Sequence, residues 1–165
     1  MENILHGNAL KYGDNINTDI ISPPAYMSLP ISEAARYSMS PIDATFSERC
    51  RPGDIFVAEK NLGSGSSRET APLALVELGI RVVIAKSFAR IFYRNCINLG
   101  LLAIECESTE RIHDGDELEV DYLNGSICDR TTGETLSCKT IPAYIIPLIQ
   151  AGGLVNYLKL KFKKE

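Results

Sequence analysis

The glycine-rich segment at residues 63–69, with the sequence GSGSSRE, constrains the fold of this chain more than any other feature. It follows an apolar run at residues 55–58 that predicts a strand, and it precedes a helical pattern that ends at Gly79. A helix that begins after such a turn has N–H groups without intrahelical partners, and these groups carry partial positive charge. The junction is therefore a candidate anion site.

The residues of this segment allow three interpretations, of which the first is a capped helix. Ser66 and Glu69 have the spacing of a capping box. Proline fits only the first helical turn, so Pro72 makes Thr70 a competing cap. In that case residues 66–69 would lie in the turn before the helix.

The other two interpretations give the segment a ligand. A nucleotide loop has little support, because Arg68 replaces the third glycine of the dinucleotide-binding pattern and no Gly-Lys-Ser/Thr triplet occurs. A catalytic carboxylate site would use the hydroxyls of Ser66 and Ser67 with the planar guanidinium of Arg68.

The bulk composition indicates a soluble globular protein. The chain has 165 residues, 45% of them hydrophobic and 23% charged, and we expect a single domain over residues 1–165. A net charge of −4 argues against nucleic acid as a partner. No leader or apolar run of membrane-spanning length is present, so we expect no membrane partner and a cytoplasmic location.

The cysteines and histidines do not form a metal-binding pattern. The five cysteines are odd in number and never have C-x-x-C spacing: Cys50, Cys96, Cys106, Cys128 and Cys138. They are typical of reduced, mostly buried thiols in a cytosolic protein. Because His6 and His113 are isolated, we predict no metal site and no cofactor bound by this chain.

Strand and helix patterns alternate along the chain. Strands are predicted at residues 4–11, 55–58, 82–85, 101–104, 116–122, 126–129 and 134–138. Helices are predicted at residues 32–39 with Ser32 as the cap, at 42–50, up to Gly79, at 88–99, and in two pieces after residue 138. This order predicts one α/β domain with a mixed sheet.

Two segments have faces or loops of interest for function. The helix at residues 88–99 is predicted to bury Phe88, Ile91, Phe92 and Cys96, and to direct a polar stripe to solvent or ion pairs: Arg90, Arg94 and Asn98. The composition of residues 12–24 predicts surface turns. The alternative for that loop is that Thr18 and Asp19 orient groups in a site.

Five segments, in their order and spacing, resemble the small subunit of 3-isopropylmalate dehydratase, the free-standing form of the aconitase swivel domain. They are YGDNINTDII at 12–21, RPGD at 51–54, GSGSSRE at 63–69, AKSFARIFYRN at 85–95 and DGD at 114–116. The resemblance covers nearly the whole chain. It implies an α/β, swivel-like domain with a mixed, barrel-like sheet and flanking helices.

The resemblance also implies an activity. The family interconverts 2-isopropylmalate and 3-isopropylmalate by dehydration and rehydration, in leucine biosynthesis. Its [4Fe–4S] cluster lies on a separate large subunit. We therefore expect a hydro-lyase that is active only with that large subunit, acts on a small hydroxy-diacid and carries no cofactor on this chain. A related dehydratase, or a non-catalytic anion-binding module of the same fold, is the alternative.

The same resemblance assigns roles to residues of the first and third motifs. Ser66 is the implied base, Arg68 the implied carboxylate ligand, and Ser67, Thr18 and Asp19 complete the site, with Asp19 counted as catalytic. A serine hydroxyl is a poor base unless its alkoxide is stabilised, and Arg68 with the helix N-terminus would supply positive charge beside it.

The loop after the first motif is expected to select the substrate. It contains Tyr26, Met27 and Leu29, where the family usually has an arginine, and no arginine or lysine occurs between Lys11 and Arg36. An unpaired substrate carboxylate would lose hydration against such a surface, whereas an alkyl group would be stabilised. We expect alkyl-substituted malates to be preferred over citrate or homoaconitate, with isopropylmalate first and dimethylmalate or citramalate next.

Overall fold

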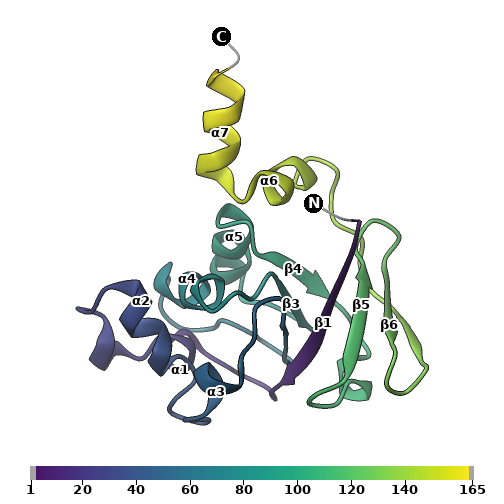
Figure 1. The fold of residues 1–165 in the computed structure, drawn as a ribbon, viewed down its shortest axis with the longest axis horizontal. Coiled ribbons are helices and arrows are strands. Elements are labelled where there is room, and N and C mark those ends of the chain that lie inside the picture. Colours follow the sequence, from purple (N-terminus) through teal and green to yellow (C-terminus); the bar gives the residue numbers. More distant parts are fainter. Residues whose placement is uncertain (1–2, 164–165) are drawn as a thin grey trace.

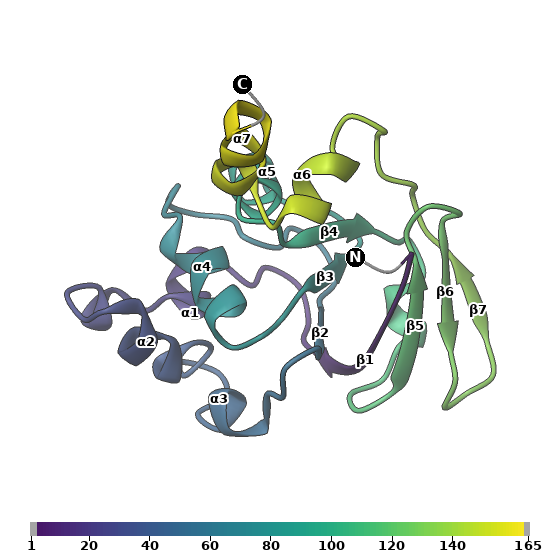
Figure 2. The ribbon, with the colours of Figure 1, turned by 45° about the horizontal axis from the view of Figure 1, so that its top comes forward.

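The computed structural model describes residues 3–163, whose strands form a mixed sheet in the order β4-β3-β2-β1-β5-β6-β7. The parallel half comprises β1 (Ile4–Lys11), β2 (Ile55–Val57), β3 (Val82–Ala85) and β4 (Leu102–Glu105). The antiparallel half adds β5 (Glu117–Asp121), β6 (Ser126–Asp129) and β7 (Thr135–Ser137). The sheet curls into a half-barrel (Figure 2).

The strand β1 joins the two halves, because it pairs along both edges. It runs parallel to β2, with Ala9 opposite Ile55, and antiparallel to β5. All residues of β2 and β3 are buried, as expected of parallel strands covered on both faces, whereas β5 and β6 alternate between buried and partly exposed residues. The predicted mixed, barrel-like sheet is therefore confirmed.

Helices gather around the parallel half, and β5–β7 form the opposite side (Figure 1). The α-helices are α1 (Thr18–Ile21), α2 (Ile31–Ala34), α3 (Phe46–Arg49), α4 (Thr70–Glu77), α5 (Arg90–Asn98), α6 (Ile146–Ala151) and α7 (Leu154–Lys163). Three short 3₁₀ turns are η1 (Pro24–Tyr26), η2 (Ala35–Tyr37) and η3 (Thr109–Arg111). Helix α7 projects from the body and buries none of its residues.

Several predicted helices are shorter than their patterns suggest. Ser32 does not cap its helix, since α2 begins at Ile31 after Pro30 and gives way to the 3₁₀ turn η2. The helix predicted at 42–50 is reduced to the single turn of α3. Conversely, the loop at 12–24 contains the helical turn α1. Such short helices have little stability of their own and form where tertiary contacts hold them.

A polar cluster fastens β1 to α3. The Tyr12 hydroxyl donates to Asp43 at 2.6 Å, and the Arg49 guanidinium donates to Asp43 and to Asp114 at 3.3 and 3.0 Å. The hydrogen bonds from Tyr12 and Thr45, with the nearby Arg49 charge, lower the pKa of Asp43 to about 2. This carboxylate therefore stabilises the fold in its ionised form.

The structure also bears on the predictions about the cysteines and about membrane-spanning segments. All five cysteines are free thiols, with Cys50, Cys96 and Cys106 buried and the other two half-buried. Over residues 3–163, no helix combines the length and apolar character that a membrane span requires.

Candidate active site

The glycine-rich loop follows β2 after a connection at residues 58–62, and backbone contacts fix its start. Leu62 pairs with the segment before α5, accepting from the Ala89 N–H at 2.9 Å and donating to the Ser87 carbonyl at 3.0 Å. The Gly63 N–H donates to Ile16 at 2.7 Å. Gly63 has a φ of +86°, and a Cβ there would lie 2.0 Å from the Phe92 ring, so glycine is required.

Helix α1 lies directly against this loop. Asn17 caps α1, because its side-chain oxygen accepts from the Ile20 N–H at 2.9 Å. The Thr18 N–H then donates to the Ser64 carbonyl at 2.9 Å. A Cβ on Gly65 would lie 3.3 Å from Thr18 Oγ1, so the two backbones pass very close to each other. As a result Asp19, the second residue of α1, is brought beside the loop.

Arg68 is the centre of the side-chain contacts. Its Nε donates to Ser66 Oγ at 3.1 Å, and one terminal nitrogen forms an ion pair with Asp19. The other terminal nitrogen donates to the Ser22 carbonyl at 3.4 Å and contacts Met27 Sδ at 3.0 Å. The Arg68 side chain is 19% exposed, whereas that of Asp19 is 59% exposed. A half-buried cation is thus held in place with one open side.

The capping-box interpretation of Ser66 is wrong. Helix α4 begins at Thr70 after Glu69, which has helical backbone angles and makes no side-chain capping bond. Pro72 lies in the first turn of α4, and the Thr70 hydroxyl accepts from Ser22 Oγ at 3.1 Å. Ser66 is exposed and contacts Arg68, so its hydroxyl has no role in starting the helix.

Thr18 and Ser67 differ in their surroundings. Thr18 is 2% exposed, and its Oγ1 is buried with no hydrogen-bond partner within residues 3–163. That hydroxyl faces Gly65, and an unpartnered buried polar atom calls for a partner from outside the chain or a water. Ser67 is exposed, and its carbonyl accepts from Asn95 Nδ2 at 3.4 Å.

The structure brings only one of the three predicted selecting residues into contact with this cluster. Met27 contacts Arg68 and is 50% exposed. Tyr26 stacks on Tyr37, with ring centroids 3.8 Å apart and planes 6° apart. Leu29 is 36% exposed, two residues beyond Met27.

Sequence reasoning missed three supporting residues. Asn17 carries a local signal, since asparagine before a short helix is a favoured cap. Ser22 and Asn95 carry none: they reach the cluster from 46 and 28 residues away along the chain. Their participation follows only from the way β2, α1 and α5 pack together.

The described residues offer no metal site of the usual kind. Within residues 3–163, no group of three or more His, Cys, Asp or Glu could hold a metal ion. Burial raises the pKa of the Cys50 and Cys138 thiols to about 11, and it raises that of Cys96 well above the usual range. Burial therefore keeps these three thiols protonated at neutral pH in the isolated chain.

The class of protein follows from the fold and from the family comparison. The family model described as "Aconitase C-terminal domain" matches residues 8–109, and the chain belongs to this family. The matched region contains the glycine-rich loop, α1 and α5.

Several proteins similar to this chain are named as small subunits. The chain is 48% identical over 168 residues to the "Isopropylmalate/citramalate isomerase small subunit" of Methanocaldococcus jannaschii, covering 100% of this chain and 99% of the relative. It is also 48% identical to the "2,3-dimethylmalate dehydratase small subunit" of Eubacterium barkeri, covering 92% and 94%. A crystal structure of 3-isopropylmalate dehydratase from M. jannaschii superposes with a TM-score of 0.91 at 43% identity, covering 98% and 99%.

Proposed function

We propose that this chain is the small subunit of a hydro-lyase that interconverts 2-isopropylmalate and 3-isopropylmalate, and that it works with a large subunit. The names of its relatives support this reaction class. The observation that carries the proposal is the contact between Arg68 Nε and Ser66 Oγ on an exposed loop, with Asp19 on the other side of the guanidinium.

Ser66 acts as the base. Its alkoxide takes the proton from the carbon beside a substrate carboxylate and becomes the neutral serine hydroxyl. The hydroxyl on the neighbouring carbon leaves with the C–O bonding electrons and takes a proton from solvent to become water. In the rehydration a water molecule gives its hydroxide to the first carbon and releases its proton to solvent, while the Ser66 proton goes to the neighbouring carbon, so the hydroxyl moves from one carbon to the other. The neighbouring Arg68 charge lowers the energy of the alkoxide. The [4Fe–4S] cluster, which we assign to the large subunit, would supply Lewis-acid activation of the leaving hydroxyl.

Arg68 binds a substrate carboxylate through its planar fork. Asp19 holds the guanidinium in position before the substrate enters, because the ion pair fixes one side of it. Thr18 and Ser67 supply hydroxyls next to the same loop, and the buried, unpartnered Oγ1 of Thr18 suits a polar group of the substrate or a bridging water.

The substrate preference rests on Met27. Its side chain is half-exposed and contacts the carboxylate-binding arginine, so it faces the part of the substrate next to the bound carboxylate. An alkyl group buried there gains about 0.8 kcal/mol per carbon, whereas a carboxylate would lack a partner. Isopropylmalate is the first choice, and citramalate and 2,3-dimethylmalate are the related substrates that the relatives' names suggest.

The test is reconstitution of the chain with its large subunit and an intact cluster, followed by competition among these acids and citrate. We expect isomerisation of alkyl-substituted malates and a relative gain for citrate or homoaconitate in Met27→Arg. Efficient turnover of citrate by the wild type, or unchanged preferences in Met27→Arg, would contradict the assignment to Met27. A complex that binds the acids but turns over none of them would favour a non-catalytic anion-binding module.

We also place the protein in the cytoplasm. The free thiols support this location, because disulfides are rare in that compartment. A fractionation of the cells with an antibody against the chain would test it.

A further inference from the structure

Helix α5 has an exposed face that includes Ile91, a residue that the sequence pattern predicts to be buried. Ile91 is 50% exposed rather than buried with the core. Arg90 and Arg94 are exposed on the adjacent stripe, one turn apart, and neither has a side-chain partner within residues 3–163. We call Arg90, Ile91 and Arg94 the α5 face.

Each of these three residues is an unfavourable choice for the chain in isolation. Arg90 occupies the first position of α5, where a cation opposes the helix dipole. Arg94 follows four residues later, where two like charges repel each other. Ile91 leaves apolar surface in water between them. All three penalties would be removed by an apolar surface that carries carboxylates.

The α5 face is continuous with the glycine-rich loop. Ile91 and Asn95 lie on the same side of the helix, one turn apart, and Asn95 Nδ2 donates to the carbonyl of Ser67. The Phe92 ring packs against Gly63 at the start of that loop. Helices α4 and α5 contact each other and lie next to each other in Figure 1, so a partner that covers the loop before α4 also meets α5.

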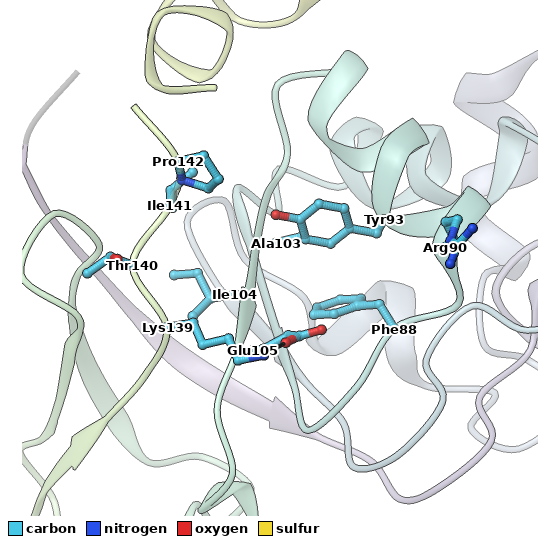
Figure 3. A pocket seen from close by; sticks show the side chains of 10 residues that line it. All are labelled: Phe88, Arg90, Tyr93, Ala103, Ile104, Glu105, Lys139, Thr140, Ile141 and Pro142. Atoms are coloured by element: carbon cyan, nitrogen blue, oxygen red, sulfur yellow. Dashed lines mark hydrogen bonds and ion pairs between the residues drawn. The ribbon is translucent and has the colours of Figure 1, made fainter. Parts of the chain in front are cut away.

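A hollow of about 400 Å³ extends this surface beyond Arg90. The side chains of Phe88 and Tyr93 line it from the α5 side, and Thr140, Ile141 and Pro142 line it from the opposite side (Figure 3). A hollow lined by aromatic rings can receive an apolar side chain, as the anchors of protein interfaces do.

We propose that the α5 face is a docking surface for the large subunit, and that an acidic patch of that subunit lies over Arg90 and Arg94. This inference rests on the proposed function. In that function the large subunit shares the active site with this chain, and it must therefore lie against the glycine-rich loop. The surface of the large subunit that binds here carries carboxylates, because the guanidinium groups of Arg90 and Arg94 are unpaired and attract negative charge.

The experiment measures the affinity of the purified chain for its large subunit, by calorimetry at two salt concentrations, for the wild type, Arg90→Glu, Arg94→Glu and Ile91→Asp. The matched control is Arg81→Glu, since Arg81 is also exposed and unpartnered but lies at the amino end of β3. We expect each α5 variant to raise the dissociation constant at least about tenfold and the control to leave it unchanged. The wild-type affinity should fall with added salt, and the arginine variants should show less of that dependence.

Activity separates the inference from the proposed function. At saturating large subunit, the α5 variants should regain most of the wild-type kcat, because none of the three residues takes part in the chemistry. Wild-type affinity in Arg90→Glu and Arg94→Glu, in a complex that isomerises its substrate, would overturn the docking surface alone. A wild-type chain that binds no large subunit would overturn both proposals. Self-association of the isolated chain that Arg94→Glu abolishes would assign the face to a second copy and also overturn the inference.

Discussion

Replacement of Ser66 by alanine separates a catalytic serine from a structural one. The side chain is exposed, it does not cap α4, and the one hydrogen bond that it makes within residues 3–163 is the 3.1 Å contact from Arg68 Nε. An exposed hydrogen bond of this kind contributes about 1 kcal/mol or less to the free energy of unfolding. For a chain of this size, that corresponds to a fall in Tm of about 4 °C at most.

The effect on catalysis should be far larger. Loss of a general base typically lowers the rate by about 10²–10⁴-fold. A thousandfold loss corresponds to about 4 kcal/mol in the activation barrier, several times the cost in stability. The two quantities therefore differ enough to be distinguished in one variant.

The assay is kcat of the reconstituted complex, alongside thermal unfolding of the isolated chain. Ser64→Ala is the matched control: Ser64 lies in the same loop, and its contact with Thr18 uses only its backbone carbonyl. The control should keep both activity and Tm. The reasoning is refuted if Ser66→Ala keeps activity within tenfold of the wild type, or if Ser64→Ala loses as much.

Three further predictions concern binding, packing and pH. Arg68→Lys should raise KM and lower kcat with a Tm within a few degrees of the wild type, because lysine keeps the charge and loses the planar fork; wild-type steady-state constants would contradict this. Gly63→Ala should cost about 2 kcal/mol or more in urea unfolding, since its Cβ would overlap the Phe92 ring at a positive φ, whereas Gly13→Ala, with open space around its Cβ, should cost less than half of that. Asp43→Asn should lower the free energy of unfolding at pH 7. The Asp43 pKa of about 2 in the folded protein lies below the unfolded value of about 3.9, so the ionised carboxylate stabilises the fold above pH 4 and loses this effect on acidification. The difference in unfolding free energy between variant and wild type should therefore shrink as the pH falls from about 4 to 2. A gap that is constant across this pH range would exclude the ionised carboxylate as its source.

Local sequence patterns predicted the sheet well. The strands at 4–11 and 82–85 have the predicted bounds. The Asn124-Gly125 pair lies in the turn between β5 and β6, but the predicted two-residue hairpin is wrong, because Asp121 pairs with Ser126 and residues 122–125 all lie in the loop. These elements were predictable because each signal is local: apolar runs, alternation, and residues that tolerate positive φ. The motifs of the glycine-rich loop and of the α1 segment likewise identified the family, because the order and spacing of motifs can be read from the sequence without knowing which residues are in contact.

The sequence by itself determined the mixed α/β class and the succession of strands and helices along the chain. It also determined the position of a glycine-rich loop, a candidate anion site, between β2 and α4. Only the tertiary structure decided that α1 is helical, that Ser66 is not a cap, and that Asp19 meets Arg68 from 49 residues away. It also decided that Ile91 faces outward, against its helical pattern. The physical reason is that a four-residue helix, a single hydrogen bond or an ion pair contributes too little to be fixed locally, so each takes its place from the packing of β1, β2 and α5 around it.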